Sequence, residues 1–116
     1  MKVQLILSRG ISISINGQDP GEGWTYGQEV KEDCTIIHFT NLKIGGTLLE
    51  TLELGWPEDG ETLPQPKMSG KLKTEDGEYD LVLTSVVETL EGSEEVPWGD
   101  GHRTIDETAL WLEFEG

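Results

Sequence analysis

Apolar and polar residues alternate along much of the chain, with the period of two that is typical of a β-strand with one buried face. Near the N-terminus two such segments, residues 3–7 and 11–15, flank a short loop at residues 8–10. A three-residue loop sets the apolar residues of one face opposite one another, with Leu5 facing Ile13, whereas a two-residue turn would set Leu5 and Leu7 opposite serines. The pattern therefore predicts a hairpin whose glycine is the left-handed residue of a three-residue loop.

A second hairpin is predicted around the Asp-Gly step at residues 76–77, because this dipeptide is a strong signal for a two-residue turn. The flanking segments, residues 68–74 and 78–85, then pair with Leu72 opposite Leu81. The opposite face sets a lysine against an aspartate. Hydrophobicity and charge thus favour the same register, as expected of a stable antiparallel pair.

The middle of the chain predicts two segments joined by a glycine pair at residues 45–46. Residues 35–40 have the composition of a strand. Residues 47–55 fit either a strand or a short helix, since they begin with a possible capping box and end at a glycine. The neighbouring β pattern favours the strand, in which Leu52 would lie opposite Phe39.

The C-terminal segment, residues 108–115, alternates leucine and phenylalanine with tryptophan and glutamate, which predicts a final strand. Residues 86–90 either extend the strand before them or begin a short helix. Loops rich in Gly, Pro and acidic residues are predicted at residues 19–23, 57–61 and 92–102. The whole chain, residues 1–116, is therefore predicted to be a single all-β domain, an antiparallel β-sandwich or partly open barrel of seven to eight strands.

The chain is strongly acidic, with 23 Asp and Glu residues against 8 Lys and Arg residues and a formal net charge of −15. The excess is uneven, because residues 59–116 carry −11 and residues 1–58 carry −4. Binding to phosphates requires clusters of Lys and Arg, so nucleic acids and anionic membranes are poor partners. A basic protein surface is the natural complement of such a chain.

Cysteine content and the N-terminus favour a cytoplasmic protein. Cys34 is the only cysteine, which excludes an internal disulfide and fits a reducing compartment. The apolar stretch at the N-terminus is too short for a signal peptide, and no apolar run is long enough to span a membrane. No basic residue follows Lys31 near Cys34, so nothing local lowers the thiol pKa, and we expect this cysteine to do no chemistry.

No motif in the sequence fixes a reaction or a cofactor. The acidic turns follow neither the EF-hand order of calcium ligands nor a glycine-rich repeat. The candidate metal ligands His38, His102, Cys34 and Asp100 lack the spacing of known sites. Neither a nucleophile elbow nor a phosphate-binding loop is present. We therefore expect a non-enzymatic protein without a metal or a cofactor.

Tryptophans and glutamates mark where a partner would bind. Trp111 is predicted on the strand face that also carries Glu113 and Glu115, which is an aromatic anchor among charges. These two glutamates are about 7 Å apart along a strand, which equals about two nucleotide steps along one DNA strand. The candidate partner-binding residues are Trp111, Glu113, Glu115, Glu91, Glu94, Glu95, Trp98 and Asp100.

Three tryptophans at loop edges, one of them the candidate Trp98, have more than one interpretation. Trp24, Trp56 and Trp98 each adjoin glycine or proline at a loop edge. They either plug the ends of the sandwich, anchor a protein partner or stack on a sugar. These alternatives stay open at the level of the sequence.

The features together predict a binding protein that blocks a basic surface of an enzyme that handles nucleic acids, as a monomer or small homo-oligomer. By analogy of class alone, small acidic single-domain proteins are common among phage-encoded and mobile-element inhibitors, including anti-CRISPR and anti-restriction proteins, and among immunity proteins of nuclease toxins. One alternative is a carbohydrate-binding β-sandwich module that uses the loop tryptophans. Another is a structural protein of a virion or other assembly.

Overall fold

A computed structural model describes residues 1–55, 69–89, 94–98, 101–105 and 109–116, and the regular structure of these residues consists of strands. These residues contain no helix, so the helical alternatives for residues 47–55 and 86–89 are wrong. The strands are β1 (Lys2–Leu7), β2 (Ile11–Ile15), β3 (Thr25–Val30), β4 (Cys34–Ile44), β5 (Thr47–Gly55), β6 (Ser69–Thr74), β7 (Gly77–Thr89), β8 (Glu94–Trp98), β9 (Gly101–Ile105) and β10 (Ala109–Glu115).

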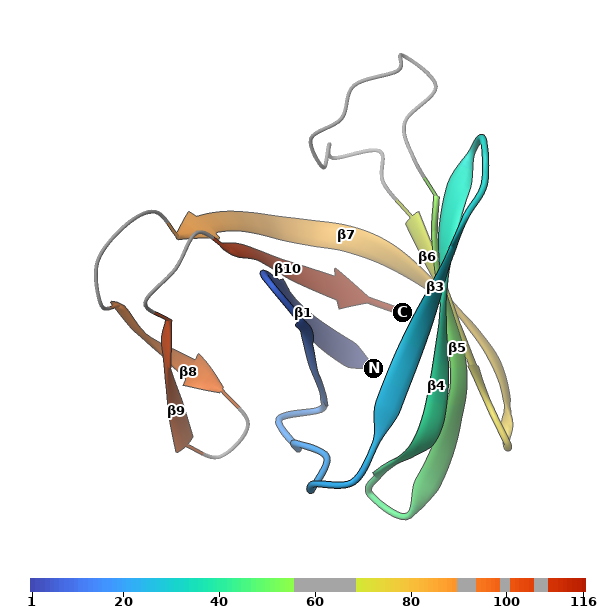
Figure 1. Ribbon diagram of the computed structural model, residues 1–116, viewed down its shortest axis with the longest axis horizontal. Helices are drawn as coiled ribbons and strands as arrows, with labels where there is room; N and C mark the ends of the chain where they lie inside the picture. The colour runs from blue at the N-terminus through green and yellow to red at the C-terminus, as the bar shows by residue number, and fades with distance from the viewer. Residues whose placement is uncertain (56–68, 90–93, 99–100, 106–108) are drawn as a thin grey trace.

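One antiparallel sheet of eight strands forms the body of the molecule, in the order β2-β1-β10-β7-β6-β5-β4-β3, and β8 pairs with β9 in a separate sheet. The large sheet curls into a half-barrel (Figure 1). The two chain ends lie side by side, because the amide of Gly116 donates to the Met1 carbonyl at 2.9 Å. The predicted all-β, partly open barrel is confirmed.

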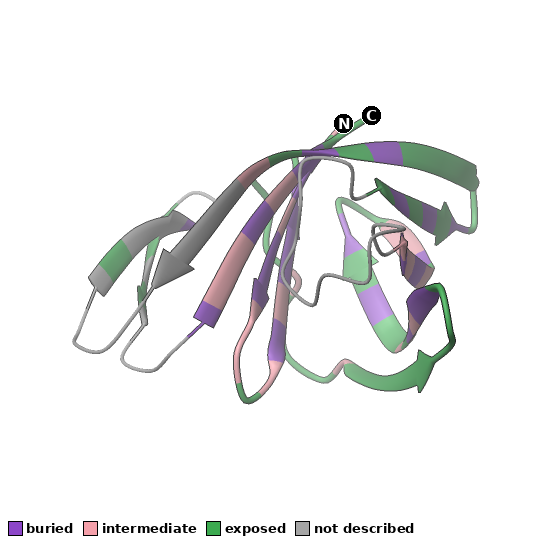
Figure 2. Ribbon diagram, turned by 90° about the horizontal axis from the view of Figure 1, so that it is seen from above, coloured by how far each residue is buried: buried purple, intermediate pink, exposed green. Residues whose placement is uncertain are grey.

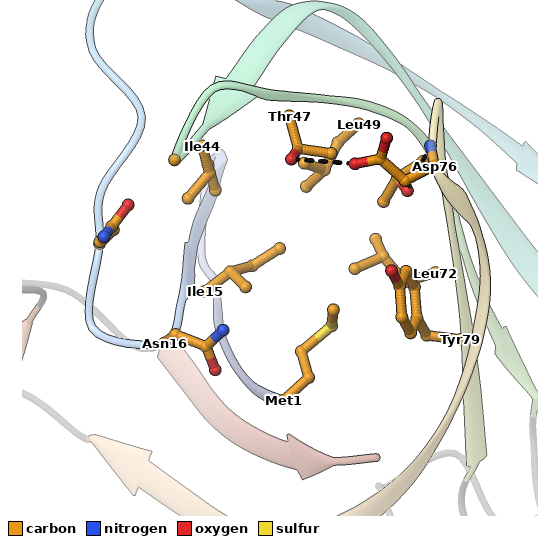
Figure 3. Close-up of a pocket in the computed structure, with 12 residues that line it drawn as sticks. Met1, Ile15, Asn16, Ile44, Thr47, Leu49, Leu72, Asp76 and Tyr79 are labelled. Atoms are coloured by element: carbon orange, nitrogen blue, oxygen red, sulfur yellow. Dashed lines mark hydrogen bonds between the residues drawn. The ribbon is translucent and has the colours of Figure 1, made fainter.

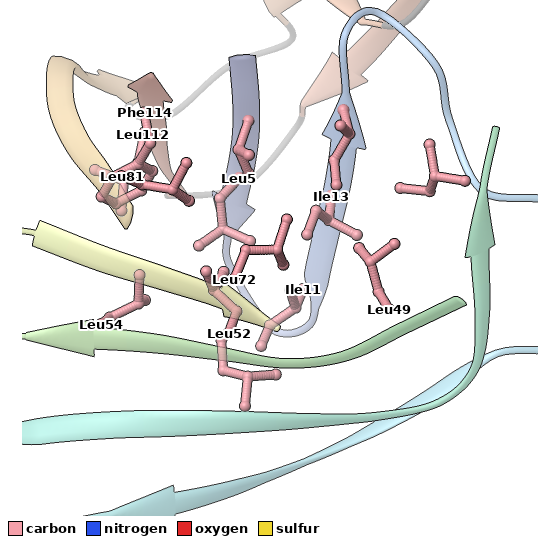
Figure 4. Close-up of a cluster of buried hydrophobic side chains, with 14 of the residues drawn as sticks. Leu5, Ile11, Ile13, Leu49, Leu52, Leu54, Leu72, Leu81, Leu112 and Phe114 are labelled. Atoms are coloured by element: carbon pink, nitrogen blue, oxygen red, sulfur yellow. The ribbon is translucent and has the colours of Figure 1, made fainter. Parts of the chain in front are cut away.

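The hydrophobic core fills the inside of the curl. Buried and exposed residues alternate along the strands, as expected when one face of a sheet is covered (Figure 2). Strands from both arms of the half-barrel contribute leucines that have no exposed surface, among them Leu5, Leu52, Leu72 and Leu112. Figure 4 shows these side chains facing one another across the interior. Because each buried leucine removes apolar surface from water, this cluster is the main stabilising element of the fold.

The N-terminal hairpin has the register that the alternation predicts. Val3 lies opposite Ile15, Leu5 opposite Ile13, and the amide of Ser8 donates to the carbonyl of Gly10 at 3.0 Å. Gly10, however, does not take the predicted left-handed conformation, since it is absent from the glycines with positive φ. Apolar pairing, and not the glycine, therefore sets this register.

The β6–β7 hairpin turns one residue earlier than its Asp-Gly step predicts. The turn residues are 75–76, so Leu72 lies opposite Tyr79 and not opposite Leu81. The predicted pairing is wrong, although Leu72 and Leu81 still share the inner face as diagonal neighbours. Charge complementarity survives the change, with Lys71 opposite Asp80 in the observed register.

The hydroxyl of Thr74 accounts for the shifted turn. It accepts the amide proton of Asp76 at 3.1 Å and donates to the carbonyl of Gly77 at 3.3 Å. This side chain thus closes the turn over residues 75–76. Gly77 follows the turn with φ of 145°, a conformation that glycine adopts without the penalty of a side chain.

The glycine pair at residues 45–46 forms the predicted turn between β4 and β5, with φ of 61° and 84°. The pairing near the turn follows the prediction, but residues 39–41 of β4 then bulge where β5 has a single residue between its paired positions. Beyond the bulge Leu52 lies opposite Ile37, so the predicted pairing with Phe39 is wrong. Asn41 has φ of 59°, which marks the bulge.

The structure adds three strands that the pattern does not predict. β3 is one edge of the large sheet, and β8 and β9 form a hairpin that begins within the region predicted as a loop at residues 92–102 and extends to Ile105. That loop prediction is wrong for residues 94–98 and 101–102. The predicted loop at residues 19–23 is confirmed, and the one at residues 57–61 lies outside the described residues.

Candidate functional site

Trp111 lies on the outer face of the sheet, as predicted, but it is half-buried there. It is directly opposite Ile6 of β1, whose own side chain is 1% exposed. Trp98 of β8 and Ala109 complete a small cluster with them, and Trp98 is 6% exposed. The two tryptophans therefore attach the β8–β9 hairpin to the outer face of the large sheet.

The indole nitrogen of Trp111 is buried as well. Its Nε1 has no hydrogen-bond partner among the described residues. A buried donor without a partner costs stability, so the favourable contribution of this ring to folding comes from its packing. The sequence predicts the face of Trp111 correctly, but it predicts neither its burial nor its contact with Trp98.

A row of polar side chains crosses the outer face beside this cluster. Ser14 donates from Oγ to Oε1 of Gln4 at 3.0 Å, and Nε2 of Gln4 donates to Oε1 of Glu113 at 2.9 Å. Nζ of Lys2 lies 3.6 Å from the same Glu113 oxygen. Ser14 has no exposed surface. The carboxylate of Glu113 is therefore held in a fixed position, with 22% of its side chain exposed.

The remaining candidate residues lie on β10, on β8 or outside the described residues. Glu115 is exposed, opposite Lys2, and Glu95 is exposed on β8. Glu94 is the first residue of β8. Glu91 and Asp100 lie outside the described residues. The structure thus brings Trp98 to Trp111, and it leaves the partner-binding role of the whole set as a prediction.

Lysines accompany the acids on the outer face of the central strands. Lys71 lies opposite Asp80, and Lys73 lies opposite Glu78 and 3.8 Å from Glu50. Together with the contact between Lys2 and Glu113, these pairs make this face mixed in charge. The acidic excess of the sequence is therefore not concentrated there.

The margin of the sheet at β3 has a more one-sided charge. Residues 19–33 contain five acidic residues and one basic residue, which accounts for the whole net charge of −4 of residues 1–58. We define the β3 acidic margin as Glu22, Glu29, Glu32 and Asp33, all of them exposed. The residues predicted from the sequence lie in the C-terminal half, whereas the local charge of residues 19–33 indicates this margin.

A cavity of about 270 Å³ opens at one end of the half-barrel (Figure 3). Apolar side chains, including Ile15, Ile44 and Leu72, form part of its wall. Thr47 donates to the carboxylate of Asp76 at 3.2 Å at the rim, which links the β4–β5 turn to the β6–β7 turn. The cavity combines an apolar interior with a carboxylate, and the sequence alone did not indicate it because its residues come from distant strands.

Two of the loop tryptophans take part in packing. Trp24 is half-buried against the core, with its ring 6.0 Å from that of Tyr26 and 6.1 Å from that of Phe39. Trp98 is buried in the outer cluster. Trp56 lies outside the described residues. This packing favours a structural role for both rings over stacking on a sugar, which needs an exposed ring face, but Trp98 covers the outer face of the sheet and does not plug an end.

Cys34 is buried at the start of β4, with 7% of its surface exposed. Burial raises the pKa of its thiol, and the nearby carboxylates of Glu53 and Asp33 raise it further. A thiol in such surroundings holds little thiolate at neutral pH and is a poor nucleophile. The physical setting therefore agrees with the expectation that Cys34 does no chemistry.

The histidines and acids do not converge in the part of the chain that the structure describes. Nε2 of His38 lies 3.3 Å from Oε2 of Glu29 on the exposed outer face, and His102 is exposed on β9. No group of three His, Cys, Asp or Glu residues that could hold a metal ion occurs among the described residues.

No family model, curated protein or solved structure matches the chain. Its described residues include no helix that is long and apolar enough to cross a membrane. The charge, burial and geometry of this chain are therefore the basis of its proposed function.

Proposed function

We propose that this is a non-enzymatic binding protein that blocks a basic, nucleic-acid-binding surface of a partner enzyme, in the manner of anti-CRISPR, anti-restriction or toxin-immunity proteins. The observation that carries the proposal is a net charge of −15 on a chain of 116 residues whose body is one curled eight-stranded sheet. Such a charge steers a basic partner towards the protein and repels nucleic acids.

The sheet adds geometry to this charge. Glu78 and Asp80 are exposed on the same face of β7, opposite Lys73 and Lys71, and Glu115 is exposed on the neighbouring β10, opposite Lys2. Residues two apart on a strand are about 7 Å apart, which matches two nucleotide steps of about 3.4 Å each along the axis of a DNA strand. The hydrogen-bonded strands already hold the backbone of these residues, so binding would order little additional main chain, which favours affinity.

The decisive experiment is a competition assay. The purified protein is titrated into complexes of labelled DNA or RNA with a restriction endonuclease, a CRISPR effector nuclease and a nuclease toxin. We expect displacement of nucleic acid from one of these enzymes, with an association rate that falls about tenfold between low and physiological salt. Failure to displace nucleic acid from any of them would count against the proposal.

Charge variants test the electrostatic part. Reversal of Glu91, Glu94 and Glu95 to lysine should slow association markedly, whereas the matched glutamine variant should slow it less, because steering depends on net charge. Circular dichroism controls for folding. An unchanged rate and salt dependence in a folded reversal variant would show that the acidity serves solubility only.

The two alternatives predict different results. A carbohydrate-binding module would show tryptophan quenching by oligosaccharides with little dependence on salt. A structural protein would form a defined oligomer at micromolar concentration, which sedimentation velocity detects. Trp24 and Trp98 pack against other side chains, and this packing favours neither the carbohydrate-binding module nor the structural protein over the inhibitor proposal.

A further inference from the structure

We propose that β3 is the docking edge for an extended, basic segment of the partner protein, which binds by adding a strand to the sheet. The basic character of this segment rests on the proposed function. Strand addition at a free sheet edge is a recurrent mode of protein recognition, in which main-chain hydrogen bonds supply affinity and alternate side chains supply specificity.

The two edges of the large sheet differ in protection. On β2, Ile11, Ile13 and Ile15 are between 1% and 8% exposed. The amide of Ile15 donates to the Gln18 carbonyl, and the Ile15 carbonyl accepts from the Gln18 amide, at 3.0 and 2.9 Å. All six residues of β3 are exposed, and Val30 is 75% exposed. In the part of the chain that the structure describes, the β2 edge is therefore covered, whereas the β3 edge is open to a partner.

The backbone hydrogen bonds of β3 show which groups are free for a partner. The amide of Lys31 donates to the carbonyl of Cys34 at 2.8 Å, at the end of the β3–β4 hairpin. Hydrogen-bonded and non-hydrogen-bonded pairs alternate along an antiparallel ladder. Counting back along the strand, residues 25, 27 and 29 point their N–H and C=O groups towards β4. Those of Tyr26, Gln28 and Val30 therefore point outwards along the free edge.

The two faces of β3 differ in the side chains they would offer. Tyr26 and Val30 share the inner face with Ile37, since Gln28 between them pairs with Ile37. Glu29 lies on the outer face, next to His38. A strand added to this edge would therefore place apolar side chains inwards beside Tyr26 and Val30, and basic side chains outwards beside Glu29.

Charge decides the occupant of this edge. The β3 acidic margin surrounds the strand with four exposed acids, and Lys31 is the only base within residues 19–33. A second copy of the chain would bring two such margins together between molecules that each carry −15, and like charges at a contact are unfavourable. A basic strand meets the same edge with charge complementarity.

A peptide probe tests the proposal directly. The acetylated and amidated heptapeptide Lys-Val-Lys-Thr-Lys-Val-Lys places its lysines on one face, and its Val and Thr residues point their main-chain groups towards β3. A control peptide is N-methylated at those Val and Thr residues, which removes the donors and keeps the charge. We expect the parent peptide to slow amide exchange of Tyr26, Gln28 and Val30, and the control to bind at least about tenfold more weakly.

A pair of protein variants supplies the second measurement. Gln28→Pro removes one outward N–H and leaves the ladder to β4, since edge strands accept proline at such positions. Gln28→Thr keeps the N–H and is the matched control. The proline variant should bind the parent peptide about tenfold more weakly and the threonine variant about as well as the wild type. If Gln28→Pro fails to fold, the difference in affinity of the wild-type protein for the parent and N-methylated peptides still tests the proposal.

Several results would overturn the proposal. Equal binding of the parent and N-methylated peptides would show that charge alone acts, and absence of binding would show that β3 accepts no basic strand. A dimer with slowed exchange at Gln28 would identify a second copy as the occupant. If Gln28→Pro displaces nucleic acid from an enzyme as well as the wild type does, the proposal that the partner docks on β3 is wrong, whereas the proposed inhibitory function is supported. If the wild type binds the peptide but blocks no enzyme, the proposed function is wrong, whereas the proposal that β3 binds a basic strand is supported.

Discussion

Trp111 of β10 lies directly opposite Ile6 of β1, on the face of the sheet that points away from the main core. Leu112, the next residue along β10, points into that core and has no exposed surface. The middle of β10 is therefore covered on both faces, by the main core on the inside and by the cluster with Trp98 on the outside. This two-sided burial changes what Trp111 is expected to do.

Replacement of Trp111 should destabilise the protein whether or not a partner is present. We expect Trp111→Ala to lower the free energy of unfolding by about 2–3 kcal/mol, because it opens a cavity against Ile6 and Trp98. Trp111→Phe should cost less, since it keeps a ring and removes the buried indole N–H. Urea denaturation measures both, with Glu115→Gln as the exposed control on the same strand. An unchanged stability in Trp111→Ala would contradict the packing role.

The polar row on the outer face makes a second prediction. Gln4→Ala removes the acceptor of the fully buried Ser14 hydroxyl, and an unsatisfied buried donor costs about 1–3 kcal/mol. Ser14→Ala removes the donor itself and should cost less. In a double-mutant cycle the two changes should be clearly non-additive, because the second change removes the group that the first leaves unpaired. Additive effects in urea denaturation would show that the hydrogen bond contributes nothing.

The shifted β6–β7 turn depends on one hydroxyl. Thr74→Val keeps the shape of the side chain but removes both hydrogen bonds that hold the turn over residues 75–76, so we expect a loss of about 1–2 kcal/mol. Thr74→Ser keeps the hydroxyl and should lose less. Nuclear Overhauser contacts across the hairpin then report the register. Pairing of Leu72 with Leu81 in Thr74→Val would show that the hydroxyl alone selects the observed turn.

Cys34 makes a prediction about pH. Its pKa in the folded protein lies above the ordinary value of 9.0, so the folded protein holds the thiol proton more tightly than the unfolded chain does. The resulting stabilisation is fully present below the unfolded pKa and is lost as the pH rises through the folded pKa. The difference in unfolding free energy between wild type and Cys34→Ser should therefore shrink above about pH 9.0.

Chemical modification provides an independent check on the same residue. A thiol-specific disulfide reagent should react slowly with folded protein at neutral pH and rapidly in denaturant, because burial limits both access and thiolate formation. Cys34→Ser should leave partner binding intact. Rapid labelling of the folded protein, or a large loss of binding in the serine variant, would contradict the assignment of Cys34 as inert.

Local patterns determined much of the fold. Val3, Leu5 and Leu7 on one segment and Ile11, Ile13 and Ile15 on the other leave one register that pairs all six on the same face, and the structure has that register. The glycine pair at residues 45–46 could supply two positive φ angles, and it forms the turn between β4 and β5. In both cases the interacting residues are close together in the sequence, so the local pattern was sufficient to predict the register or the turn.

Other features depended on contacts between distant residues. The β8–β9 hairpin lies in a stretch rich in Gly, Pro and acids that resembles a loop, and the packing of Trp98 on Ile6 and Trp111 attaches it to the sheet. The bulge at residues 39–41 changes the partner of Leu52. Neither has a local signal, because the packing that favours each comes from strands far away in the chain.

The candidate binding surface was also determined partly by the sequence and partly by the tertiary structure. The sequence by itself determined the net charge of −15 and the alternation of Trp111 with Leu112. Only the tertiary structure decided that lysines accompany the acids of the central outer face, that Trp111 is half-buried, and that β3 is the open edge beside four exposed acids. Composition fixes how much charge a chain carries, whereas strand order and register fix which charges meet a neighbour and which face solvent.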